Sequence, residues 1–133
     1  MAVITPLFKE HTDLPDLASR FVEVDKLPWK PTPCAGIEMK ILMQDEETGM
    51  MTALFKWAPG SKLTFHEHVA LEQTFVLEGT LVDDEGEVTA GNYVWRPAGS
   101  RHDAWSPNGA LILSVFLKPN IFLDEEKMGV ELK

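Results

Sequence analysis

Cysteine, basic residues and long apolar runs are all scarce in this 133-residue sequence. Cys34 is the single cysteine, so the chain cannot form an internal disulfide, which is typical of proteins in a reducing compartment. Lys and Arg number 12 against 21 Asp and Glu, which gives a formal net charge of −9. Because an acidic chain repels phosphate backbones and anionic lipids, we expect neither nucleic acid nor a membrane surface as a partner.

No apolar run approaches the roughly 18 residues that a membrane-spanning helix needs. The first residues, Met-Ala-Val-Ile-Thr-Pro, lack the basic and apolar regions of a signal peptide, so we expect a cytoplasmic protein. Hydrophobic residues make up 44% and charged residues 25% of the chain, proportions typical of a globular protein with a substantial core. The length favours one domain.

Short alternating segments separated by turn residues dominate the middle of the chain. Residues 36–43 alternate, and the acidic turn at 45–49 leads to a returning strand at 50–57. We predict further strands at 63–68, 73–78, 80–83, 91–96, 102–105 and 111–117, with a second acidic turn at 83–86. About eight short strands with such regular turns predict an all-β barrel or sandwich.

Two segments flank this strand-rich region, which we place at residues 29–118. Residues 1–28 contain three prolines and no sustained period, so we interpret them as an N-terminal arm with one short helical turn at 13–18. Residues 119–133 are charged and weakly apolar, and we expect a C-terminal tail that packs either on the barrel or on a partner. The arm is suited to exchange between two subunits, and we expect a homodimer.

The residues that indicate chemistry follow the turn at 58–61. The sequence runs Gly60-Ser-Lys-Leu-Thr-Phe-His66-Glu-His68-Val-Ala-Leu-Glu72, and Gly79 follows after six more residues. Two histidines separated by one residue project from the same face of a β-strand. Glu72 can close on the same ion if the chain bends there. His102, at the end of the segment 91–102, offers a fourth ligand.

These segments resemble the two motifs of the cupin superfamily, G-x5-H-x-H-x3-E-x6-G and G-x5-P-x-G-x2-H-x3-N. Every position of the first motif is met, and the second is met through His102, with Ser106 where the motif ends in Asn. The resemblance implies an RmlC-like cupin jelly roll, a double-stranded β-helix barrel. It also implies one divalent metal ion per chain, bound by His66, His68, Glu72 and His102.

A narrower resemblance covers roughly residues 29–117. The segments Trp29-Lys-Pro-Thr-Pro, Gly36-Ile-Glu-Met-Lys-Ile-Leu and Arg96-Pro-Ala-Gly-Ser-Arg-His102 look like the cupin branch that contains the C-terminal domain of ChrR-type anti-sigma factors. Small stand-alone dioxygenases that cleave diketones or hydroxylated aryl ketones are similar to the same branch. Those enzymes use three histidines without the carboxylate, so Glu72 departs from their pattern and favours a four-ligand site.

The ligand types alone do not select one metal, since imidazole and carboxylate suit Fe²⁺, Zn²⁺, Mn²⁺ and Ni²⁺. We expect Fe²⁺ if the protein is an enzyme, because iron can bind O₂ and a chelating substrate together, whereas zinc would act as a Lewis acid or a structural ion. Glu72 has the alternative role of an acceptor that orients a histidine ring. No catalytic residue is indicated beyond the metal ligands.

Several other side chains near the motifs have two interpretations. Arg96 and Arg101 either hold a substrate carboxylate or stabilise turns on the surface, and the surface role is favoured. Lys62 shares the parity of His66, which makes it a candidate for binding substrate at the barrel mouth. Trp57 and Trp95 are candidates for lining a dry pocket.

Three functions remain open. The favoured one is a metal-dependent oxidoreductase, a dioxygenase that cleaves a C–C bond in a small-molecule substrate, either a dicarbonyl or a hydroxyketone. The second is a metal- or ligand-sensing regulatory module that resembles the ChrR C-terminal domain. Anti-sigma activity itself is not expected, because this chain has one cysteine and lacks the separate zinc-binding helical domain of that family. The third is a metal-assisted isomerase or lyase.

Overall fold

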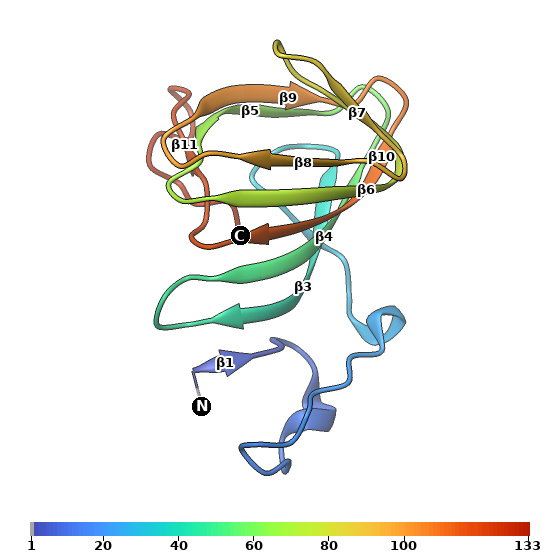
Figure 1. Cartoon of the computed structure of the whole chain (residues 1–133), viewed down its shortest axis with the longest axis vertical. Helices are drawn as coiled ribbons and strands as arrows, with labels where there is room; N and C mark the ends of the chain where they lie inside the picture. Colours follow the sequence, from blue (N-terminus) through green and yellow to red (C-terminus); the bar gives the residue numbers. More distant parts are fainter. Residues whose placement is uncertain (1) are drawn as a thin grey trace.

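Nearly all regular structure in the computed structural model, which describes residues 2–133, is β. The strands are β1 (Val3–Ile4), β2 (Lys30–Pro31), β3 (Ile37–Asp45), β4 (Met51–Trp57), β5 (Lys62–Glu67), β6 (Glu72–Val82), β7 (Glu87–Thr89), β8 (Tyr93–Arg96), β9 (Arg101–Trp105), β10 (Ala110–Phe116) and β11 (Ile121–Phe122). They curl into a barrel (Figure 1), so the predicted all-β barrel is confirmed.

The barrel is closed by antiparallel pairing in the order β1-β3-β4-β10-β6-β9-β5-β11. Strand β6 is central, since it pairs with β10 and β8 along its first half and with β7 along its second half. The two strands predicted at 73–78 and 80–83 are one continuous strand that passes through Gly79. Gly79 has a φ of 76°, and a Cβ there would lie 1.9 Å from the Gly109 carbonyl oxygen. This position therefore requires glycine.

The core lies against the inner faces of β3, β4 and β10. Alternation along β4 sends Ala53, Phe55 and Trp57 inward, and Phe116 on β10 meets Phe55 edge-to-face with ring centroids 5.8 Å apart. Full burial of an aromatic or long aliphatic side chain stabilises a fold by about 1.5–3 kcal/mol. This apolar packing is therefore the main source of stability for the barrel.

Both acidic turns form as predicted, and each is held by the carboxylate of its first residue. The Asp45 side chain accepts a hydrogen bond from the Glu47 backbone N–H at 2.9 Å. The Asp83 side chain accepts from the Glu85 N–H at 2.8 Å and from the Gly86 N–H at 3.1 Å. Aspartate favours such turns because its short side chain reaches the backbone two or three residues ahead.

The N-terminal segment lies below the barrel (Figure 1) and joins it through β1, where Val3 pairs with Asp45 and Ile4 with Gln44. The helical turn predicted at 13–18 is wrong. Residues 15–18 form a reverse turn, closed by the Ala18 N–H on the Pro15 carbonyl at 3.0 Å. Proline lacks an N–H and disfavours helical backbone in the residue before it, so Pro15 prevents a helix here.

Short 3-10 helices occur instead at η1 (Lys9–His11) and η2 (Val24–Lys26). Neither these nor any other helix within residues 2–133 has the length and apolar character needed to cross a membrane.

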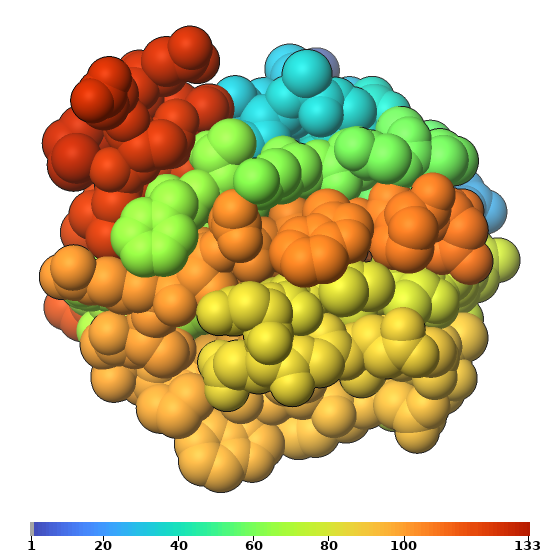
Figure 2. Space-filling model, turned by 90° about the horizontal axis from the view of Figure 1, so that it is seen from above, coloured from blue at the N-terminus to red at the C-terminus, as the bar shows by residue number. Residues whose placement is uncertain are grey.

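The C-terminal segment after Pro119 packs on the barrel, which is the first of the two alternatives expected for it. Strand β11 pairs with β5, placing Ile121 opposite Glu67 and Phe122 opposite His66. Phe122 and Leu132 are almost fully buried. Figure 2 shows this segment, in red, beside the green atoms of β5. One side of the barrel is therefore closed by residues that follow the last long strand.

Candidate metal centre

Three histidines from separate parts of the barrel come together in its interior. His66 lies on β5, His68 follows the end of that strand, and His102 lies on β9 directly opposite His66. One ring nitrogen from each lies within 4.8 Å of the other two. All three side chains are buried. The two sequence motifs therefore converge on one site, as their spacing predicts.

A β-bulge sets which side chains of β5 face inward. The register with β9 shifts between Leu63 and His66, so that Leu63 and His66 are both buried although they are three residues apart. Lys62 consequently points outward and pairs with Asp103 at 2.8 Å. The prediction that Lys62 shares the inward face of His66 is wrong, because simple alternation does not hold across a bulge.

Each histidine ring is anchored through its Nδ1 atom. Nδ1 of His66 lies 2.8 Å from the Thr64 carbonyl, Nδ1 of His68 lies 3.0 Å from the Ser100 carbonyl, and Nδ1 of His102 lies 3.1 Å from the Asp83 carboxylate. Carbonyl and carboxylate oxygens only accept, so these partners assign the proton to Nδ1 and leave the Nε2 lone pairs unprotonated.

One unsatisfied atom of the cluster points to a ligand. Nε2 of His68 is buried and has no hydrogen-bond partner among residues 2–133. Buried polar atoms are nearly always satisfied, so an orphaned imidazole nitrogen facing two further imidazoles fits a metal ion. Metal-binding histidines also usually form a hydrogen bond through the ring nitrogen that does not bind the metal, as these three do through Nδ1.

The electrostatics of the site keep the histidines neutral. Burial lowers the pKa of His66 and of His68 to about 4. Burial, with the nearby positive charge of Arg96, lowers the pKa of His102 to about 3. A metal ion requires the neutral imidazole, and at neutral pH no proton competes for these nitrogens. The donor set therefore fits a divalent ion.

Glu72 lies beside the three histidines rather than inside their cluster. Its Oε1 atom is 3.7 Å from Nε2 of His68. The same oxygen accepts a hydrogen bond from Asn120 Nδ2 at 2.9 Å, and Oε2 accepts from the Thr74 hydroxyl at 3.1 Å. Direct ligation by Glu72 stays a prediction. Asn120, which reaches the site from the C-terminal segment, was not predicted from the sequence.

The two arginines of the second motif have different environments in the structure. Arg101 is exposed and pairs with Glu67 at 2.8 Å, as the favoured surface role predicts. The surface role is wrong for Arg96, whose side chain is 11% exposed and pairs with the buried Asp83. Burial alone would raise the pKa of Asp83, but Arg96 and backbone N–H groups outweigh it and lower that pKa. Asp83 was anticipated only as a turn residue, yet its Oδ2 holds both Arg96 and His102.

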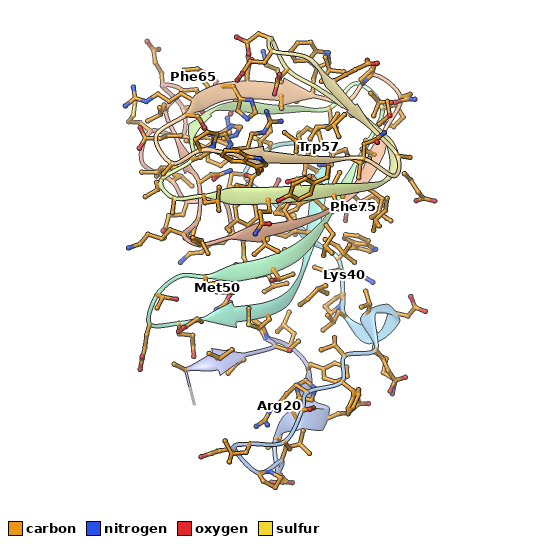
Figure 3. The ribbon with its side chains drawn as sticks, in the orientation of Figure 1. Arg20, Lys40, Met50, Trp57, Phe65 and Phe75 are labelled. Carbon is orange, nitrogen blue, oxygen red and sulfur yellow. The ribbon has the colours of Figure 1, made fainter. Side chains whose placement is uncertain are left out.

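Two spaces adjoin the cluster. An interior cavity of about 30 Å³ is bounded by His66, Glu72, Arg96 and His102 and by an apolar wall of Phe55, Trp57, Leu63, Leu81, Ala104, Ile112, Phe116 and Leu132, with Ser114. Such a cavity has room for on the order of one or two water molecules. Trp57 is labelled among the strands in Figure 3 and lines this cavity, as predicted.

A larger groove of about 340 Å³ lies on the other side of the cluster. It runs between the β6–β7 turn and β8, and His68, His102, Asp83 and Arg96 form part of its wall. Trp95 borders this outer groove and is 58% exposed, so its predicted place in the dry interior pocket is wrong. The cluster is thus bounded by a small interior cavity and by a wider groove.

The barrel and its inward histidines define a protein of the cupin class with a jelly-roll fold. The ChrR cupin-like domain family matches residues 18–120, and the chain belongs to this family. The sequence has no significant match to any curated relative.

Solved structures with the same fold include two assigned to one activity. A proposed acetylacetone dioxygenase from Methylibium petroleiphilum is 25% identical, with a TM-score of 0.77 and 90% of each chain covered. An acetylacetone dioxygenase from Acinetobacter johnsonii is 22% identical, with a TM-score of 0.77, covering 91% of this chain and 89% of the other. The anti-sigma factor ChrR of Rhodobacter sphaeroides is 20% identical, with a TM-score of 0.61, over 71% of this chain and 51% of its own.

Proposed function

We propose that this protein is a metal-dependent dioxygenase that cleaves a C–C bond in a small dicarbonyl or hydroxyketone. The observation that carries the proposal is the convergence of three neutral histidines, each fixed through Nδ1, on a space that the chain itself does not fill. The likeness to the Methylibium protein over 90% of both chains supports this reaction class.

His66, His68 and His102 would hold the metal, with Glu72 close enough to join them after a small shift. A divalent ion bound there would supply a Lewis acid for two substrate oxygens and, as iron, a binding position for O₂. The apolar side chains of the interior cavity exclude water from this region, which strengthens electrostatic interactions with bound substrate.

Oxygen consumption tests this proposal. The metal-free protein is loaded anaerobically with Fe²⁺, mixed with a panel of diketones and hydroxyketones, and O₂ uptake is followed. We expect uptake that needs both iron and substrate and that is absent from the zinc-loaded protein and from His66→Ala. If the iron-loaded protein consumes no O₂ with any member of the panel, the dioxygenase proposal fails.

A regulatory module is the second candidate function. Two observations favour it: membership of the ChrR cupin-like family, and an interior cavity of about 30 Å³, which is smaller than any diketone. In such a module metal or ligand occupancy would change contacts with a protein partner. The absence of O₂ uptake, together with a partner that binds the metal-loaded protein but not His66→Ala, would favour this function over the enzyme.

We further propose that the protein is a homodimer joined through its N-terminal arm. Leu17 and Phe21 of the arm are 99% and 84% exposed, which is unusual for large apolar side chains. Light scattering after size exclusion should give a dimer for the full chain and a monomer for the double variant Leu17→Ser, Phe21→Ser. A wild-type monomer contradicts the proposal, and so does a dimer that the double variant leaves unchanged.

A further inference from the structure

Arg96 faces the interior of the barrel next to the candidate metal centre. Along β8, Tyr93 and Trp95 are exposed, so Val94 and Arg96 occupy the inward positions. Arg96 is the direct cross-strand partner of Glu72 on β6, which places both side chains on the same inner face. A positive charge is thus fixed beside the three histidines.

The hydrogen bonding of Arg96 is incomplete. Its Nη1 donates to Asp83 Oδ2, and this is the one hydrogen bond that its side chain makes with residues 2–133. A guanidinium carries several N–H donors in a rigid fork that matches two oxygens of an anion. The remaining nitrogens of this side chain, which is 11% exposed, stay accessible to solvent and can donate to an acceptor atom of a ligand.

The position of Arg96 connects the two spaces at the cluster. Arg96 and His102 both line the small interior cavity and the larger groove of about 340 Å³. A compound of a few carbon atoms fits the groove and not the cavity. A ligand in the groove lies against a wall that Arg96 shares with His68 and His102.

The charges around the candidate metal position favour a ligand of one particular net charge. Next to the three neutral histidines, two positive charges on a divalent ion and one on Arg96 would exceed by one the two negative charges of Glu72 and Asp83. A monoanion therefore neutralises the metal-loaded site. In a partly buried place of low dielectric this balance discriminates strongly between neutral and anionic ligands. The wall of the outer groove adds Glu85, Glu87 and Arg101.

We propose that Arg96 binds an anionic oxygen of a small monoanionic substrate, an enolate or a carboxylate, which enters through the outer groove and lies beside the metal ligands. This inference rests on the proposed function and narrows its substrate class. Asp83 acts as a positioning residue, because one carboxylate oxygen holds both Arg96 and His102. The anion site and the metal site are thereby fixed relative to each other.

Binding to the zinc-loaded protein tests the inference without turnover. Acetylacetone, as its enolate, and pyruvate serve as monoanionic probes, and imidazole serves as a neutral metal ligand, each titrated calorimetrically. Arg96→Met should weaken binding of a monoanion by at least about tenfold, the loss expected for a charge-assisted hydrogen bond. Imidazole affinity and zinc content should stay at the wild-type level.

Two variants sharpen this test. Arg96→Lys keeps the charge without the fork and should bind the monoanions with intermediate affinity. Arg101→Met removes the neighbouring exposed arginine of the same motif and should bind them like wild type.

Three outcomes would overturn the inference. In the first, the zinc-loaded wild type binds neither monoanion. In the second, Arg96→Met binds the monoanions as tightly as wild type does. In the third, Arg96→Met loses zinc while Arg101→Met retains it, which would assign Arg96 a structural role. Failure of the dioxygenase proposal has a different signature. In that case the iron-loaded protein consumes no O₂, while monoanion binding still depends on Arg96.

Discussion

Two walls of the same barrel differ in the polarity of their inward side chains. On β3, β4 and β10 most inward positions are apolar and almost fully buried, as at Met39, Ala53 and Phe116, and Ser114 on β10 is a polar exception. On β5, β9 and the adjoining ends of β6 and β8, the inward positions include His66, His102, Glu72 and Arg96. Alternation thus builds the apolar wall, and alternation together with a bulge in β5 brings the polar side chains to the other wall.

The polar wall depends on support from outside its strands. His68 and His102 are held by Ser100 and Asp83, and Glu72 is held by Asn120 in the C-terminal segment. Apolar side chains need only complementary volume, whereas buried polar groups need specific partners. Changes on the apolar wall should therefore alter stability, and changes on the polar wall should alter metal binding.

The largest effect on stability is expected on the apolar wall. Met39 is fully buried, and Met39→Ala should lower the free energy of unfolding by about 2–5 kcal/mol through lost burial and a residual cavity. Urea unfolding measures this loss, and the folded variant should bind as much zinc as wild type. Loss of zinc at unchanged stability would contradict the separation of the two walls.

A supporting residue of the polar wall should show the reverse pattern. Asp83→Asn weakens the contacts to Arg96 and His102, and we expect metal affinity to fall by about 10–100-fold, as for other partners of ligating histidines. Competition with a chelator measures this affinity. Asp103→Asn is the matched control, since Asp103 neighbours His102 but pairs outward with Lys62. Equal effects of the two substitutions would exclude the positioning role of Asp83.

Local chemistry explains what the sequence predicted well. The acidic turns follow from aspartate side chains that bond their own backbone, and the strands between them follow from alternation. The histidine cluster was predictable because its residues stand at motif spacing. The turns and strands depend on residues close together in the chain, and the histidine cluster depends on two motifs that each have a fixed spacing.

Features that the sequence did not reveal depend on distant pairing. Arg96 faces inward because its strand pairs with β6 in one register, which places it opposite Glu72. Lys62 faces outward because of a bulge that no local pattern marks. Asn120 reaches Glu72 from 48 residues away, in a segment with too few apolar residues to show a period. Such contacts form only when strands that are distant in the sequence pair in the folded barrel.

A smaller effect on stability is expected at the point where the C-terminal segment meets the polar wall. Asn120→Ala removes the donor to Glu72 Oε1 and should lower the unfolding free energy by about 1–3 kcal/mol, because a buried carboxylate oxygen loses its partner. Urea unfolding of the metal-free protein measures it. Asn92→Ala, at an exposed position, should have little effect. Wild-type stability in Asn120→Ala would show that the segment does not support Glu72.

A pH dependence of stability is also expected in the metal-free protein. In the folded chain the pKa values of His66 and His68 are about 4 and that of His102 about 3, against 6.5 when unfolded. Above pH 6.5 neither state binds these protons. Below it the unfolded state binds more, so the unfolding free energy falls as the pH drops. Denaturant unfolding between pH 7 and about pH 5, before most carboxylates titrate, measures this slope. A flat profile would contradict the burial of neutral histidines.

The metal content of purified protein tests the central claim most directly. Wild type, His66→Ala, His102→Ala and His11→Ala are incubated with Fe²⁺ or Zn²⁺, desalted and subjected to elemental analysis. His11 lies in the N-terminal arm and contacts the Phe21 carbonyl, which makes its variant the matched control. We expect one divalent ion per chain in wild type and His11→Ala and almost none in His66→Ala or His102→Ala. A wild type that retains no metal, or full metal content in both barrel variants, would contradict it.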